Sequence, residues 1–159
     1  MNENEPQTIA KPSLKTYLRL RLRIGLITTI FGLIIFILGV KPALFGQDRS
    51  PVMGFVQIAV FLVGMAFICL GGYITLNALW DGAEKSIAAD FGFRFVATGY
   101  VICVTSGMAD VFGFGNQPFP QIPYFGPWQA LGVILGELII ILGFLLLIPW
   151  PKRSQPPTT

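Results

Sequence analysis

Four runs of apolar residues dominate the chain, separated by shorter polar, basic or glycine- and proline-rich stretches. The runs lie at 24–40, within 50–80, at about 91–109 and at about 128–150. Each is long enough for a helix that crosses the hydrocarbon core of a bilayer, which takes about 20 residues. The runs are continuously apolar rather than alternating, which favours helices over barrel strands. The pattern predicts an all-α integral membrane protein, a four-transmembrane-helix bundle.

The residues that flank the runs set the expected limits of the membrane domain. We expect helices at about 13–40, 52–80, 82–110 and 127–149, within one domain over 13–150. Asp81 and Glu84 have the spacing of a capping box, which places the start of the third helix near residue 82. Residues 1–12 and 151–159 are expected to be disordered cytoplasmic tails. The uncharged segment 111–127 is rich in glycine, proline and aromatic residues, so it is either an interfacial segment or a lid over the bundle.

Small residues recur every seven positions in all four predicted helices. This spacing keeps one stripe facing a neighbouring helix, and small residues in lipid allow backbones to approach closely. We therefore predict helix packing through glycine stripes that comprise Gly25, Gly32 and Gly39 in the first helix, Gly64 and Gly71 in the second, Gly92 and Gly99 in the third, and Gly136 and Gly143 in the fourth.

The two halves of the chain also resemble each other. An offset of 67 takes Gly25 and Gly32 to glycines of the third helix, and an offset of 72 takes Gly64 and Gly71 to glycines of the fourth. The sequence thus predicts an internal repeat of two tandem two-helix hairpins. The alternative is chance matching within an apolar sequence that contains 18 glycines. Two carboxylates break the correspondence, because Glu137 matches Met65 and Asp110 matches Ala43.

The distribution of charge predicts the orientation. Only 12% of the residues are charged, whereas soluble domains carry about 25%. Nine of the 11 Lys and Arg residues lie in the N-terminal segment, the connection between the second and third helices, and the C-terminal tail. The positive-inside rule then predicts a multi-pass protein with both termini cytoplasmic, and we expect a bacterial-type cell membrane.

A basic cluster precedes the first apolar run. We expect it to bind anionic lipid headgroups, and it consists of Lys11, Lys15, Arg19, Arg21 and Arg23. Tyr17 is the single aromatic residue within it, too few for a base-stacking surface, so nucleic acid is not an expected partner.

Glu137 is the residue that most needs an explanation. It lies about ten residues inside the fourth helix, near the midplane, where a charge costs at least about 2.5–3.5 kcal/mol. It is either a proton relay or ion site, or a protonated group hydrogen-bonded to another helix. Depth along the helices favours Tyr100 as its partner, and Gln57 and Gln129 complete the intramembrane polar residues expected near it.

A second pair of charges is expected at the outer ends of the helices. Asp110 and Lys41 end the third and first helices at similar depths. The sequence predicts an ion pair at the outer rim, with a substrate-binding mouth as the alternative.

Reactive motifs are scarce. The chain contains no His, GxSxG motif or P-loop, and Cys69 and Cys103 have apolar neighbours and no CxxC spacing. We therefore expect no enzyme activity, cofactor or metal. The favoured hypothesis is a non-enzymatic accessory or scaffold subunit of a membrane complex. The alternatives are a small oligomeric proton-coupled transporter or permease that uses Glu137, and a membrane enzyme or quinone-binding subunit.

The orientation generates a direct prediction. A cysteine introduced at Gln117 should react with an impermeant thiol reagent added to intact cells, whereas one introduced at Ser154 should react only after permeabilisation. The charge bias is the reason. The reverse labelling pattern would show that the chain is inserted the other way round.

Overall fold

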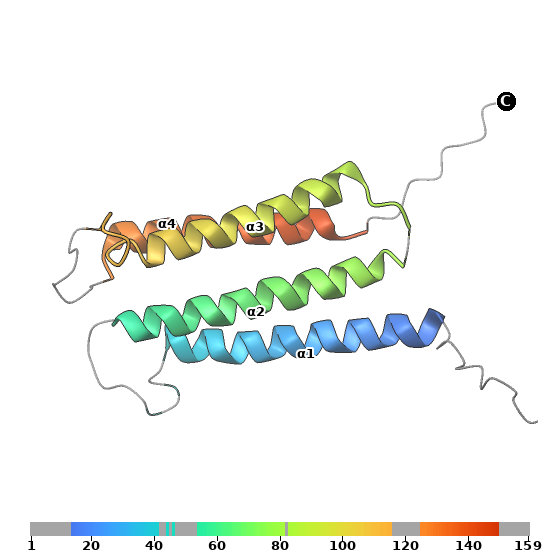
Figure 1. Ribbon diagram of the computed structural model, residues 1–159, viewed down its shortest axis with the longest axis horizontal. Helices are drawn as coiled ribbons and strands as arrows, with labels where there is room; N and C mark the ends of the chain where they lie inside the picture. The colour runs from blue at the N-terminus through green and yellow to red at the C-terminus, as the bar shows by residue number, and fades with distance from the viewer. Residues whose placement is uncertain are drawn as a thin grey trace, which may run out of the picture.

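The computed structural model describes residues 14–41, 44, 46, 54–81, 83–115 and 125–149 and is built from four helices (Figure 1). They are α1 (Leu14–Val40), α2 (Phe55–Leu79), α3 (Ile87–Gly107) and α4 (Pro127–Leu147), and the described residues contain no strand. All four are long and apolar enough to cross a membrane. The prediction of an all-α, multi-pass membrane protein with four such helices is therefore confirmed. The predicted terminal tails lie outside the described residues.

The start of α3 differs from the prediction. Ser86, not Asp81, is the N-cap, and its hydroxyl accepts a hydrogen bond from the Ala89 N–H at 3.2 Å. Asp81 instead follows the end of α2 with φ 44°, a left-handed conformation that Asp tolerates better than most residues. The predicted capping box is therefore wrong, because Asp81 helps to turn the chain out of α2 and α3 begins five residues later than expected.

The other helix limits lie within three residues of those predicted, and α4 begins at the predicted residue. α3 ends at Gly107 rather than near 110, because residues 108–113 form turns. α4 begins at Pro127, a favourable first helical residue. The Gly126 N–H before it donates to Gln129 Oε1 at 2.9 Å. Gln129 therefore satisfies the backbone at the start of α4.

The helices associate as two hairpins, α1 with α2 and α3 with α4. Figure 1 shows these pairs as two layers, with α2 lying between α1 and the second hairpin. Within the described ranges, α1 contacts no helix other than α2, whereas α2 also contacts α3 and α4. We call the end where α1 and α3 begin and α2 and α4 end the basic end, since Lys15, Lys85 and Arg94 lie there.

Backbone contact between glycines holds each hairpin together. A Cβ added to Gly32 would lie 2.8 Å from the Gly64 carbonyl oxygen, and one added to Gly99 would lie 2.6 Å from the Gly136 carbonyl oxygen. Real Cβ atoms do not approach that closely, so any side chain at these positions would force the helices apart. Close packing is what holds helices together in lipid, so this separation would destabilise the hairpin. Comparable contacts with the partner helix surround the rest of the predicted stripes, namely Gly25, Gly39, Gly64, Gly71, Gly92, Gly136 and Gly143.

The glycine contacts of the two hairpins fall at corresponding positions. Gly25 lies against Gly71 and Thr75 in the first hairpin, and Gly92 lies against Gly143 and Leu147 in the second. These positions differ by the offsets of 67 and 72 found in the sequence. The same offsets relate two further pairs of contacts. The contact of Gly64 with Phe36 corresponds to that of Gly136 with Cys103. The contact of Gly71 with Thr29 corresponds to that of Gly143 with Val96. The two hairpins therefore cross in the same way.

Gly99→Ala tests the backbone contact. The added methyl would meet the Gly136 carbonyl oxygen at 2.6 Å and the Ile140 nitrogen at 2.9 Å. We expect the protein to lose more than about 1 kcal/mol of stability, as overpacked cores do. Gly54→Ala is the control, because nothing lies within 4 Å of its added Cβ. Equal thermal stability of the two variants in detergent would contradict the role assigned to Gly99.

Candidate functional site

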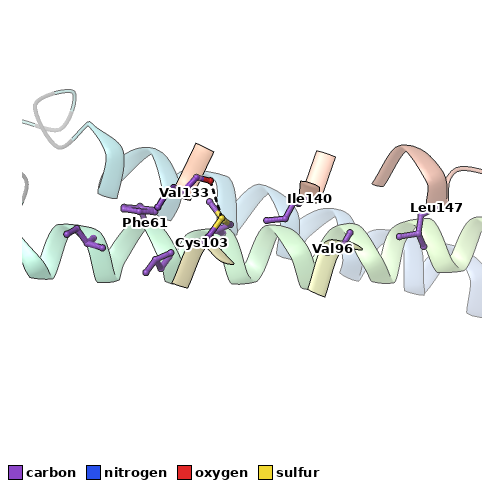
Figure 2. Packing of buried hydrophobic residues seen from close by; sticks show 9 residues of the cluster. Phe61, Val96, Cys103, Val133, Ile140 and Leu147 are labelled. Atoms are coloured by element: carbon purple, nitrogen blue, oxygen red, sulfur yellow. Dashed lines mark hydrogen bonds between the residues drawn. The ribbon is translucent and has the colours of Figure 1, made fainter. Parts of the chain in front are cut away.

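The surface where α2 faces α3 and α4 brings together most of the chemically distinctive side chains. We call it the seam. Ile58 and Leu62 of α2 approach Gly107 of α3, and Gly72 of α2 lies against the ring of Phe144 of α4. Figure 2 shows the buried apolar cluster that continues between the helices, in which Phe61, Val96, Cys103, Val133, Ile140 and Leu147 are labelled. The seam is therefore mainly an apolar contact between the two hairpins.

Two interactions join the hairpins near opposite ends of the seam. At the basic end, the Trp80 Nε1–H donates to the Leu147 carbonyl oxygen at 3.0 Å. At the other end, the rings of Phe61 and Phe125 meet edge to face with centroids 6.3 Å apart. The sequence analysis missed both interactions, because neither residue pair has a spacing that predicts proximity. The Trp80 bond also satisfies one of the carbonyls that a helix C-terminus leaves free.

Glu137 lies on the side of α4 that faces the seam. It precedes Phe144 by one heptad, and Phe144 packs on Gly72 of α2. Since α2 and α4 run in the same direction, one heptad back from Gly72 is Met65, which is only 4% exposed. Glu137 is half-buried. The heptad spacing therefore puts Glu137 on the face of α4 that carries Phe144, at the level of Met65 in α2.

The side chain described near Glu137 is the weakly polar thiol of Cys103. Gly136, the neighbour of Glu137, lies against Cys103 Sγ, and Cys103 is close enough to Glu137 to interact with it electrostatically. The Cys103 thiol donates to the Val133 carbonyl oxygen at 3.4 Å, the bond drawn in Figure 2. Among the described residues no hydrogen bond joins Glu137 to Tyr100. The structure thus gives no support to Tyr100 as the direct partner.

The remaining predicted polar residues lie in different environments. Tyr100 faces a groove between α2 and α3 together with Cys69. Gln129 is occupied at the start of α4, where it accepts the Gly126 N–H. Gln57 is half-buried near the start of α2. Of the four residues predicted as one intramembrane polar site, Gln57 and Gln129 therefore lie near helix starts, Tyr100 lines the α2–α3 groove, and Glu137 lies midway along α4.

The two charges of the predicted rim pair differ in burial. Asp110 is 4% exposed and folds against Gly115, while Lys41 is exposed. Within the described ranges α1 makes no contact with α3, so the arrangement of these helices gives no support to an ion pair between their ends. Asp110 lies within the turns over 108–113, and its carbonyl oxygen accepts a hydrogen bond from the Gly113 N–H at 3.3 Å.

The predicted headgroup-binding residues cluster at the beginning of α1. Lys15, Arg19 and Arg23 are exposed there. The Arg21 guanidinium lies 5.7 Å from the centroid of the Tyr17 ring, a cation–π contact. Lys11 lies outside the described residues. This arrangement places positive charge where a helix leaves the hydrocarbon core.

The described residues hold no group of three or more Cys, Asp or Glu side chains that could bind a metal ion. Asp110 is the single charged residue among the buried side chains that the structure describes. The one acidic side chain that the described part of the seam offers is therefore Glu137.

Trp80→Phe tests how the two hairpins are joined. The change keeps an aromatic ring but removes the hydrogen bond to Leu147, and we expect a loss of about 1 kcal/mol. Trp128→Phe is the matched control, because Trp128 is 76% exposed. The measurement is thermal unfolding in the same detergent. A Trp80→Phe protein as stable as the control variant would show that the bond contributes nothing.

Compared with known protein families, with curated proteins and with solved structures, the chain matches none. A role for the seam is therefore argued from the placement of its own residues.

Proposed function

We propose that this protein is a non-enzymatic accessory or scaffold subunit of a membrane complex. The observation that carries the proposal is the position of α1, which contacts α2 alone among the described helices. The remainder of its circumference is apolar and open, and includes Ile27, Ile30 and Ile34, each at least half exposed. A helix held by one neighbour presents a long surface to other transmembrane helices, and such helices associate in lipid by packing.

The packing of the bundle supports the same proposal. Glycine contacts close each hairpin on itself, and apolar side chains fill the seam. A bundle of this kind offers its outer surfaces for recognition rather than a polar interior for catalysis or permeation. The hypothesis of a membrane enzyme or quinone-binding subunit gains no supporting observation from this arrangement.

We also infer the setting in which the subunit works. The basic cluster at the start of α1, together with Lys85 and Arg94 at the same end, supports cytoplasmic termini in a bacterial-type cell membrane. Anionic lipid headgroups would bind the exposed Lys15, Arg19 and Arg23. The matched glycine contacts support an origin of the two hairpins by duplication.

Crosslinking from α1 tests the scaffold proposal. A photoreactive amino acid at Ile27, which is 66% exposed, should crosslink in cells to a second membrane protein. That protein should also copurify with the wild type in mild detergent at fixed stoichiometry, as mass spectrometry would show. The same probe at Leu138 of α4, 58% exposed, is the control and should react mainly with lipid. A purified protein that contains this chain alone, with no crosslink specific to Ile27, would contradict the proposal.

A second candidate function rests on Glu137. A half-buried carboxyl group at membrane depth, where the first hairpin has Met65, is a default position for proton or ion coupling. The candidate is a small oligomeric proton-coupled transporter or permease, in which Glu137 would alternately hold and release a proton toward the seam.

Glu137→Gln separates the two candidate functions. Gln is close in size and keeps hydrogen-bonding capacity but cannot carry a proton. If the protein is a scaffold, the variant should keep its partners and its thermal stability. Loss of pH-dependent transport in reconstituted vesicles by a folded Glu137→Gln protein, with transport retained by Asp90→Asn, would favour the transporter. Asp90 is a suitable control because it is exposed near the start of α3.

A further inference from the structure

A groove of about 230 Å³ runs between α2 and α3 and is open on one side. Ala66, Cys69 and Tyr73 of α2 face Phe93, Ala97 and Tyr100 of α3 across it, and its walls are almost wholly apolar. From Ala66 to Tyr73 the groove follows seven residues of helix, or about 10 Å. Both helices are long enough to cross a membrane, so the medium at its open side is hydrocarbon. Water is a poor occupant of an apolar space at this depth.

The dimensions of the groove suit one hydrocarbon chain. A volume of 230 Å³ spread over about 10 Å corresponds to a cross-section of about 23 Å². An α-helix with its side chains is about 10–12 Å in diameter, so it could lie along the open side of the groove but not inside it. The small side chains of Ala66 and Ala97 leave the space, and the rings of Tyr73 and Phe93, with centroids 4.8 Å apart, bound it toward the basic end.

A cation lies over this end of the groove. The Lys85 ammonium is 5.8 Å from the centroid of the Tyr73 ring, and the Lys85 side chain is exposed. Lys85 also lines a pocket of about 370 Å³ at the end of the bundle, together with Glu84, Ser86 and Trp80. The Ser86 hydroxyl and the Trp80 indole N–H are already bonded to Ala89 and Leu147, so Lys85 and Glu84 supply the charge there.

We propose that the α2–α3 groove and Lys85 form a binding site for one phospholipid of the leaflet at the basic end. An acyl chain occupies the groove, and the phosphate lies beside the Lys85 ammonium. Glu84, which lines the same pocket, suits a zwitterionic headgroup whose ammonium group lies near its carboxylate. The site combines an apolar slot with a cation at headgroup depth. This combination matches the apolar chain and the negatively charged phosphate of a phospholipid.

Native mass spectrometry of the full chain tests the site. The protein in mild detergent is titrated with phosphatidylethanolamine, and the fraction carrying one bound lipid is measured. Ala97→Phe should abolish the bound fraction by filling the groove. Thr98→Phe, the same enlargement at the next residue of α3, should not, because Thr98 is exposed and outside the groove. Ala66→Phe closes the groove from α2 and should repeat the loss if Ala97→Phe fails to fold.

The headgroup contact is tested by charge removal. Lys85→Ala should lower the bound fraction about fivefold, the factor expected for one Lys near a lipid phosphate. Lys15→Ala removes an exposed charge from the same end of the bundle and should have no such effect. Binding that survives both Ala97→Phe and Ala66→Phe would overturn the proposal. So would a wild-type protein that binds no phospholipid, or a copurifying polypeptide that Ala97→Phe displaces.

Discussion

The structure depends on contact between helix backbones at glycine. In lipid no hydrophobic force drives apolar helices together, so their association requires close packing. Gly32 against Gly64 and Gly99 against Gly136 bring the axes of each hairpin near enough for neighbouring side chains to interlock. The heptad spacing continues this contact along each helix, because it keeps one stripe facing the partner over several turns. Every larger feature of the bundle follows from two hairpins closed in this way.

The contact between the hairpins is of a different kind, because there Gly72 and Gly107 meet side chains rather than the backbone of another helix. It relies on larger side chains such as Ile58, Leu62 and Met65, with Trp80 and Phe61 joining the hairpins at its two ends. Larger side chains leave spaces where their shapes do not match, and the α2–α3 groove is one of them. The seam is therefore where a lipid or a titrating group can be accommodated without breaking either hairpin.

The two hairpins correspond in their glycine contacts but differ in the side chains next to these glycines. Met65 and Glu137 follow corresponding glycines and lie on the sides of α2 and α4 that face the seam. The position is apolar and buried in the first hairpin, while in the second it carries the carboxyl group of Glu137. Such an asymmetry suits either a structural polar group in the seam or a proton site. The open circumference of α1 independently favours a protein that works by contact with others.

The sequence by itself determined the four helices and the close-packing stripes, because apolar run length and heptad spacing are local properties of the chain. The N-cap of α3 could not be predicted from local sequence, since Asp81 and Ser86 are both suitable N-cap residues. The left-handed backbone at Asp81 and the hydrogen bond to the Ser86 hydroxyl decided between them. Only the tertiary structure decided which helix faces each remaining polar group. Depth along a helix placed Tyr100 level with Glu137, but the rotation of α3 about its axis turned Tyr100 toward Cys69 and the groove. That rotation follows from how the hairpins meet, through contacts between helices such as Phe144 on Gly72 and Phe93 against Tyr73.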